Sequence, residues 1–363
     1  MKEMTFVLFY FYINLIIINT NFISIQNYSN NISNSFIDYF YSKTHCFTKG
    51  TNNNTNIISK NFEFCQKCAK TKKKKRKKSK NCKKCNTNEI LRELKIISPD
   101  ETLDEIINNN KSISRFGDGE LNIIFGGKTG FQKFNKKLSQ RLYDILQTNE
   151  KGLLIGMPDT LDLGNSNKFT DGCKRYWAKW IKKNFFKLIF LLNKNKTYYS
   201  SFITRFYILY KDKSKISDYV GKLKKIWNQK DIVIIEGQKS RLGVNNNLFD
   251  NVKSIQRILC PSINAFNLYN KILNSALKIE KNKLILLALG PTASVLAYDL
   301  YKAGYQVIDI GHVDIEYEWF IRNSTKVIRI PNKYVNEAKN GNKNIGIVKD
   351  NKYYNQIIEK ILN

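Results

Sequence analysis

Residues 283–303 read KLILLALGPTASVLAYDLYKA, in which an aliphatic run passes directly into a helical pattern. Residues 283–288 have the length and composition of a strand that is buried on both faces of a sheet. Gly290 follows this run, and Pro291 then occupies a position of the kind favoured for proline in a first helical turn. The segment predicts a buried strand that leads straight into a helix.

The same order, an apolar run of strand length and then a helical pattern, recurs along the chain. Five more apolar runs of strand length occur at residues 112–116, 152–156, 231–236, 254–260 and 306–310. Helical patterns accompany them at residues 138–146, 176–192, 218–227, 264–275 and 292–303. This order predicts an α/β fold with a mainly parallel sheet and helices on both faces. Because ligands of such sheets bind at the carboxyl ends of the strands, site residues are expected directly after the runs.

The composition excludes a chain that is disordered throughout, because 42% of the 363 residues are hydrophobic and can form a sizeable core. The 61 lysines and arginines outnumber the 30 acids and give a net charge of +31. Such a surface fits an anionic partner, which could be nucleic acid, a membrane surface, a nucleotide or an acidic glycan. The net charge alone does not distinguish these partners.

Shifts in composition divide the chain into four parts. Residues 1–25 are apolar, and residues 5–25 form a candidate membrane anchor that is interrupted by asparagines. Residues 26–90 are an Asn- and Lys-rich linker of low complexity, and residues 91–340 hold the α/β body. Residues 341–363 are expected to form a C-terminal helical tail. The protein is then expected in the cytoplasm, tethered to a membrane if the anchor inserts.

Two pairs of cysteines lie in the linker at CxxC spacing, and they are Cys65, Cys68, Cys82 and Cys85. Two such turns can offer four thiolates to one ion, so the spacing is typical of a structural Zn²⁺ site. The spacer is nearly all lysine and has no apolar residue to pack on the metal. The alternative is a basic tract with incidental cysteines, which would attract nucleic acid or an anionic membrane surface.

The first predicted strand-end segment contains two acids spaced by one glycine. In an extended stretch, Asp118 and Glu120 would point to the same face and could hold one hard cation. Gly117 and Gly119 would let the backbone approach a ligand closely.

Two further strand ends carry chemistry that suits phosphate. Glu236 and Arg241 follow the run at 231–236, and the Arg241 guanidinium offers a bidentate fork for an anion. Gly290 and Thr292 begin the helix after residue 288, where backbone amides and a hydroxyl can bind an anion. The lysine of a P-loop is missing there, which argues against an NTPase.

Residues 309–319 read DIGHVDIEYEW and concentrate acids behind a predicted strand. If the segment were extended, His312, Asp314, Glu316 and Glu318 would share one face. That charge density requires a cation, a basic partner or a raised pKa.

Six segments then carry a family resemblance, and in chain order they read RFGDGE (115–120), EGQKSRLGV (236–244), LFDN (248–251), ILCPSINAF (258–266), ALGPTASVLAYDL (288–300) and DIGHVDIEYEW (309–319). Together they resemble the GT-D-fold glycosyltransferase domain of bacterial surface-polymer and adhesin-glycosylation enzymes. The resemblance implies a Rossmann-like fold and transfer from a nucleotide-sugar donor, a UDP-sugar in the studied case, to a glycan or glycoprotein acceptor. The chain departs from the family at residues 245–247, where Asn-Asn-Asn replaces the usual Gly-Asn-Asp.

The resemblance places the family's metal motif, which would hold Mn²⁺ or Mg²⁺, on Asp118 and Glu120. For the donor we expect the binding residues Arg115, Gly117, Gly119, Glu236, Arg241, Gly290 and Thr292. For an inverting transfer the first choice of base is Glu316, followed by Asp314 and Glu318. Two alternatives stay open, a metal-dependent phosphohydrolase and a nucleic-acid-binding protein that uses the Cys- and Lys-rich segment.

Overall fold

The computed structural model describes residues 91 and 94–362, apart from the side chains of residues 163–165. The candidate anchor at 5–25, the linker and the four-cysteine set of Cys65, Cys68, Cys82 and Cys85 lie outside the described residues. Within the described residues, every helix is too short or too polar to span a bilayer.

The described residues form one sheet of nine parallel strands in the order β1-β4-β3-β2-β8-β7-β5-β6-β9. The strands are β1 (Lys95–Ile96), β2 (Ser112–Arg115), β3 (Leu153–Met157), β4 (Thr197–Ser200), β5 (Asp231–Gly237), β6 (Ser254–Cys260), β7 (Leu284–Ala288), β8 (Val307–Asp309) and β9 (Ile357–Lys360). The predicted α/β fold with a parallel sheet is confirmed.

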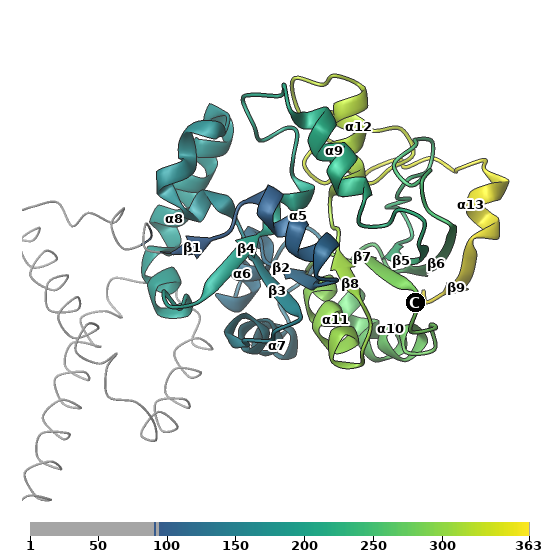
Figure 1. Cartoon of the computed structure of the whole chain (residues 1–363), viewed down its shortest axis with the longest axis horizontal. Helices are drawn as coiled ribbons and strands as arrows, with labels where there is room; N and C mark the ends of the chain where they lie inside the picture. Colours follow the sequence, from purple (N-terminus) through teal and green to yellow (C-terminus); the bar gives the residue numbers. More distant parts are fainter. Residues whose placement is uncertain (1–90, 92–93, 363) are drawn as a thin grey trace, which may run out of the picture. The chain divides into compact units, whose positions relative to one another are not determined.

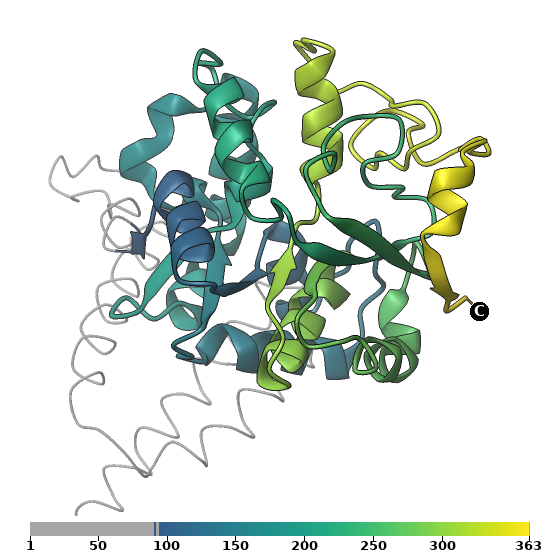
Figure 2. The ribbon, with the colours of Figure 1, turned by 45° about the vertical axis from the view of Figure 1, so that its right-hand side comes forward.

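Helices cover both faces of this sheet (Figures 1 and 2). The helices are α5 (Pro99–Asn108), α6 (Asp118–Ile124), α7 (Lys136–Gln147), α8 (Asp171–Leu191), α9 (Ile216–Lys224), α10 (Tyr269–Ala276), α11 (Pro291–Lys302), α12 (Val313–Ile321) and α13 (Asn351–Asn355). Short 3₁₀ turns are η1 (Asp159–Leu161), η2 (Leu163–Lys168), η3 (Ser201–Thr204) and η4 (Ala265–Leu268).

Strand β7 shows how the sequence builds the two layers. Ile285 and Leu287 point to one face, where they pack in a core with α6, α7, α8, α10 and α11. Leu284 and Leu286 point to the other face and pack with α5, α9 and α12. All four side chains are buried, as the aliphatic run predicts, and burial of each contributes about 1.5–3 kcal/mol.

The C-terminal segment corrects one prediction. We expected a helical tail at 341–363, but the only helix described there is the five-residue α13, and the chain then forms β9. β9 lies on the outer edge of β6, where the amide of Ile361 donates to the carbonyl oxygen of Leu259 at 2.7 Å. Pairing of otherwise unsatisfied backbone groups on the sheet edge explains why a strand forms there.

The topology places a crevice beside β2 and β8, which are neighbours at the centre of the sheet. From β2 the chain crosses to β3 on one side, whereas from β8 it passes through α12 and finally reaches β9 at the opposite edge. Ligands of open α/β sheets bind where neighbouring strands send the chain in opposite directions.

Candidate active site

A cavity of about 1130 Å³ opens at this crevice, at the carboxyl ends of the strands. Its wall consists of segments that follow β2, β5, β6, β7 and β8, together with the first two turns of α8 and part of η3. Residues from two loops, 128–133 and 334–337, complete the wall. The predicted position of the site relative to the sheet therefore agrees with the cavity.

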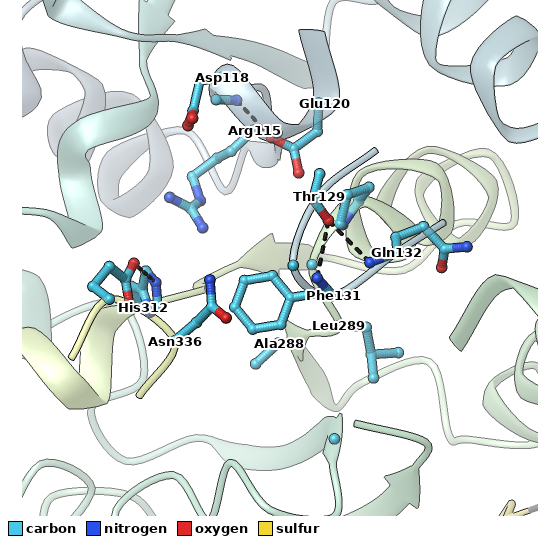
Figure 3. A pocket seen from close by; sticks show the side chains of 18 of the residues that line it. Arg115, Asp118, Glu120, Thr129, Phe131, Gln132, Ala288, Leu289, His312 and Asn336 are labelled. Atoms are coloured by element: carbon cyan, nitrogen blue, oxygen red, sulfur yellow. Dashed lines mark hydrogen bonds and ion pairs between the residues drawn. The ribbon is translucent and has the colours of Figure 1, made fainter. Parts of the chain in front are cut away.

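Asp118 and Glu120 both line the cavity, from the first turn of α6 (Figure 3). The amide of Gly117 donates to Glu120 Oε2 at 2.7 Å, and Asp118 Oδ2 accepts a hydrogen bond from the Tyr176 hydroxyl of α8. The expectation of an extended stretch with both acids on one face is wrong, because helix positions i and i+2 differ by about 200°. The two acids reach the same cavity because the N-terminus of α6 faces it.

The environment of Glu120 disfavours its negative charge. Burial raises the pKa of Glu120 to about 7, the charges of Asp309 and Asp118 add to the effect, and backbone hydrogen bonds oppose it. Asp118 Oδ1 and Glu120 Oε1 have no hydrogen-bond partner among the described residues. A divalent cation bound to these oxygens would relieve the repulsion, and such hard cations prefer carboxylate ligands.

A cation at this position would be only partly coordinated by protein. The described residues contain no group of three or more His, Cys, Asp and Glu side chains that could hold a metal ion. Water or a bound ligand would therefore have to supply the other ligands, as is usual for Mg²⁺ held by one or two carboxylates and substrate phosphates.

Arg115 lies in the cavity wall at the end of β2, fixed by three hydrogen bonds. Its Nε donates to the Asp309 carbonyl oxygen at 2.7 Å, its Nη1 to the Ser201 carbonyl oxygen at 2.9 Å, and its Nη2 to Asp309 Oδ1 at 3.1 Å. Gly311 leaves room for the guanidinium, because a Cβ at this position would lie 1.9 Å from Arg115 Nη2. Two of the five guanidinium donors remain for an anion in the cavity.

The structure does not place Glu236 and Arg241 in the cavity wall, although the sequence suggested donor binding for both. Glu236 is fully buried; burial raises its pKa, and the ion pair with Arg257 at 2.5 Å opposes that shift. Arg241 Nη1 donates to the carbonyl oxygens of Asn332 and Gly346, both at 2.7 Å. Both predicted ligands instead connect strands and loops of the fold.

The helix start after β7 is divided between the cavity and the core. Gly290 lines the cavity together with Gly117 and Gly119, and its φ of 54° belongs to the left-handed region that glycine adopts readily. Thr292 is fully buried outside the cavity wall, and its Oγ1 has no hydrogen-bond partner among the described residues. The structure therefore does not support the predicted contact between the Thr292 hydroxyl and a ligand.

The three predicted bases lie on α12, which is a helix and not the extended strand we expected. Glu316 is fully buried, and its Oε2 accepts hydrogen bonds from the amides of Tyr207 and Ile208, both at 2.9 Å. Asp314 and Glu318 both bind the ammonium of Lys333, at 2.7 and 3.0 Å. Asp314 alone of the three lines the cavity. Their prediction as bases is therefore not supported by their surroundings.

Several cavity residues were missed by the sequence analysis. Arg205 follows β4, a strand too short and polar to be predicted, so its position at a strand end gave no signal. Glu337 lies in a loop, and no local pattern marks it. Phe131 and Tyr334, whose ring centroids lie 5.6 Å apart, form an aromatic wall from two loops (Figure 3 shows Phe131).

Comparisons with known proteins agree with the resemblance in the sequence. Residues 113–338 match the family described as glycosyltransferase GT-D fold. The chain is 38% identical over 265 residues to glycosyltransferase GlyD of Streptococcus pneumoniae serotype 4, which is 73% of this chain and 32% of that protein. It is 36% identical over 272 residues to the probable glycosyl transferase Gly of Streptococcus gordonii, which is 74% of this chain and 39% of that protein. The chain thus spans only about a third of the length of these relatives.

Solved structures give the same assignment. A structure of the domain of unknown function 1792, reported to have a distinct glycosyltransferase fold, matches with a TM-score of 0.73 and 38% identity over 76% of this chain and 99% of that chain. A glycosyltransferase with this domain from Streptococcus sanguinis matches with a TM-score of 0.71 and 35% identity over 74% and 99% of the two chains. The chain therefore belongs to the family of glycosyltransferases with the GT-D fold.

Proposed function

We propose that this protein transfers a sugar from a nucleoside diphosphate donor, a UDP-sugar, to a glycan or glycoprotein acceptor, and that Asp118 and Glu120 hold the Mn²⁺ or Mg²⁺ that the reaction requires. One observation carries the proposal. The two carboxylates line a strand-end cavity in a GT-D domain, and each has an oxygen without a partner among the described residues.

The chemistry of the reaction explains why these groups suit the site. Transfer breaks the bond between the sugar and the diphosphate, so the leaving group gains negative charge that must be stabilised. When bound, a divalent cation would neutralise part of this charge. Arg115 supplies two further N–H donors from the adjacent strand end, and its pair with Asp309 fixes its position before the donor arrives.

The test is a transfer assay of the full chain with a panel of UDP-sugars, p-nitrophenyl glycosides as acceptors, and Mn²⁺. Asp118→Ala and Glu120→Ala should each lower the transfer rate at least ~100-fold, since each removes one of two protein ligands to the cation. Asp218 provides a matched control, because it is an exposed acid in the first turn of α9, and Asp218→Ala should keep the wild-type rate. Wild-type turnover in both site variants would contradict the metal assignment.

The same assay separates the transferase from a phosphohydrolase. A phosphohydrolase would release phosphate from simple phosphomonoesters in the absence of any sugar nucleotide. Release of this kind, combined with failure of every UDP-sugar to give a glycoside product, would contradict sugar transfer.

A further inference from the structure

Helix α8 exposes a face whose positive charge is not compensated by acids. On its inward side, Trp177 and Trp180 are buried in the core. Its outward side exposes four basic side chains, which are Arg175, Lys179, Lys182 and Lys183. The one acid of the helix, Asp171, lies in the first turn and already pairs with Lys174 at 2.9 Å and with Lys211 at 3.4 Å. No ion pair of the four outward cations is found in the described part of the chain, so their charge is available to a partner.

The same face also exposes two aromatic rings, since Phe186 is 59% exposed and Phe190 is 51% exposed. Positions 179, 183, 186 and 190 follow the spacing of one helix face, so the rings continue the stripe that Lys179 and Lys183 begin. Covering apolar rings that water surrounds is favourable. Helices that lie on anionic membranes bind by these two contributions, the burial of apolar side chains and the attraction of Lys and Arg to lipid headgroups.

Contacts on the inward side of α8 fix the orientation of this face. Trp180 Nε1 donates to Asn122 Oδ1 of α6 at 3.1 Å, and the Trp180 ring stacks on Phe125 with 6.3 Å between the centroids. The Thr170 hydroxyl caps the N-terminus of α8 by accepting from the amide of Cys173 at 3.4 Å. A helix that is already formed does not have to be ordered when it binds, so its conformational entropy is not lost at that step.

The place where the chain enters the sheet favours a bilayer over nucleic acid as the partner. Lys95 of β1 pairs with Thr197 of β4, the strand that follows α8 in the chain. The chain therefore enters the sheet beside the C-terminal end of α8, where both exposed phenylalanines lie. The candidate anchor at 5–25 and the lysine tract of the linker precede this point in the sequence. Stable attachment to a bilayer takes two signals, and an anchor combined with a basic surface provides them.

Nucleic acid would use the cations of α8 but would leave the two rings without a role. Aromatic side chains that bind single strands stack on the bases inside positively charged grooves. Phe186 and Phe190 lie instead on the outside of a helix, next to the cations. This arrangement suits a broad surface that takes up apolar groups below a layer of negative charge.

We propose that the outward face of α8 binds the surface of a bilayer that contains anionic lipids. Its four cations contact the phosphate groups of the lipids, and the phenylalanines enter the boundary between headgroups and acyl chains. Tyr176 and Trp177, at the other end of α8, belong to the cavity wall, so the bound surface adjoins the candidate active site. The inference does not depend on sugar transfer, and its test does not measure transfer.

The test uses the full chain and reports contact at α8 itself. Phe186→Trp adds an indole to the face, and the difference in fluorescence between variant and wild type isolates it from the native tryptophans. Vesicles of phosphatidylglycerol and brominated phosphatidylcholine should quench about half or more of this difference, because bromine on the acyl chains quenches indoles at that depth. Without phosphatidylglycerol, the quenching should fall at least ~threefold.

Tyr354→Trp is the matched control for this measurement. Tyr354 is an aromatic side chain of α13 that is 44% exposed, and α13 lies across the described domain from α8 (Figures 1 and 2). The same vesicles should quench less than about 10% of its difference signal. Attachment through the residues before 91 alone would leave both indoles unquenched, so the pair of variants separates α8 from the anchor and the lysine tract.

Removal of three cations tests the electrostatic part. Lys179→Gln, Lys182→Gln and Lys183→Gln, combined in the Phe186→Trp chain, should raise the vesicle concentration for half-maximal quenching about 10–100-fold. The control removes the same charge from exposed lysines outside α8, by Lys326→Gln, Lys349→Gln and Lys352→Gln. This control should keep the half-maximal concentration within about threefold of the Phe186→Trp chain.

A second measurement uses the wild-type chain. Anionic vesicles should slow the acetylation of Lys179, Lys182 and Lys183 by sulfo-N-hydroxysuccinimide acetate at least ~threefold and leave Lys326 unchanged, as read by mass spectrometry. If these three lysines are not protected, or if the indole of Phe186→Trp is quenched no more than that of Tyr354→Trp, the face does not bind a bilayer. If single-stranded DNA protects the three lysines and vesicles do not, the partner is nucleic acid and the inference is wrong.

Discussion

Two helices that begin at the ends of neighbouring strands carry similarly spaced acids and use them in opposite ways. α6 follows β2 and begins with Asp118 and Glu120, which line the cavity and each retain an oxygen without a partner in the described part of the chain. α12 follows β8, and its acids Asp314 and Glu316 are buried and bound by other residues, although Glu316 Oε1 has no hydrogen bond and only an ion pair with Arg205 Nη1 at 3.7 Å. The partners that the rest of the fold supplies, and not the spacing of the acids, decide which set can bind a ligand.

The acids of α12 serve the fold by holding loops. Lys333 comes from the long segment after α12, and the amides of Tyr207 and Ile208 come from the segment after η3. Buried charges are costly unless they are paired and hydrogen-bonded, so removing one partner leaves the others uncompensated. The comparison therefore predicts stability effects at α12 and activity effects at α6.

Lys333→Ala should give the largest effect on stability. The Lys333 side chain is 3% exposed and neutralises two buried carboxylates, so its loss should lower the free energy of unfolding by about 3–5 kcal/mol. Urea denaturation followed by circular dichroism measures this change. The exposed Lys326→Ala should stay within about 0.5 kcal/mol of the wild type. A loss below about 1 kcal/mol in Lys333→Ala would show that the α12 network does not stabilise the fold.

A matched carboxylate-to-amide pair sharpens the comparison. In Glu316→Gln, the new NH₂ group is a hydrogen-bond donor that must face either the backbone N–H groups of Tyr207 and Ile208 or the Arg205 guanidinium, which are donors too. The free energy of unfolding should therefore fall by about 1–3 kcal/mol. In Asp118→Asn, the new carbonyl can still accept from Tyr176, so stability should change by less than about 0.5 kcal/mol while Mn²⁺-dependent transfer falls. Equal stability losses in the two variants would remove the distinction between the regions.

The sequence predicted the sheet well where strands are aliphatic. The run at 283–288 and the five similar runs all became central strands, because burial on both faces demands a continuous apolar stretch. The strands it missed are β1, β4 and β9, which are short or polar and are defined by pairing with a neighbour. Such pairing depends on contacts between distant residues, and no local pattern records it.

The site was predictable only in part, for the same reason. Arg115, Asp118 and Glu120 were found because Arg115 lies at the end of a predicted strand and the two acids follow that strand. Arg205 and Glu337 were missed because an unpredicted strand and a loop bring them to His312. Conversely, the acids of α12 looked like site residues because the sequence does not show that Lys333 reaches them.

The titration of Glu120 gives a smaller and pH-dependent effect. Its pKa in the folded chain is raised to about 7 from 4.5, so its contribution to stability is complete below pH 4.5 and is lost as the pH rises through 7. Glu120→Gln keeps a neutral side chain at every pH. Without added metal, the variant should match the wild type at pH 5 and exceed its free energy of unfolding at pH 8 by about 1–2 kcal/mol, since partial exposure reduces the full effect.

Thermal unfolding at the two pH values measures this difference, as a rise of about 2–4 °C in Tm at pH 8 alone. Asp218→Asn, an exposed acid at the equivalent place in α9, provides the control and should show no pH-dependent gain. A gain for Glu120→Gln at pH 5 as large as at pH 8 would contradict charge as the cause.

Removal of one hydroxyl from each region gives the smallest effects and the finest comparison. Tyr317 of α12 is 4% exposed and its hydroxyl donates to Asn247 Oδ1, so Tyr317→Phe should cost about 1 kcal/mol of stability and leave the Mn²⁺ requirement unchanged. Tyr176 is 50% exposed, so Tyr176→Phe should cost about 0.5 kcal/mol or less.

The Tyr176 hydroxyl nevertheless donates to Asp118 and orients that carboxylate. Its loss should raise the Mn²⁺ concentration for half-maximal transfer by about threefold to tenfold, near the low end for a lost partner of a metal ligand, because Tyr176 is half exposed to water. Titration of both variants with Mn²⁺ in the transfer assay makes the comparison. If Tyr317→Phe changed the Mn²⁺ requirement and Tyr176→Phe did not, the candidate cation site would have to be moved from α6 to α12.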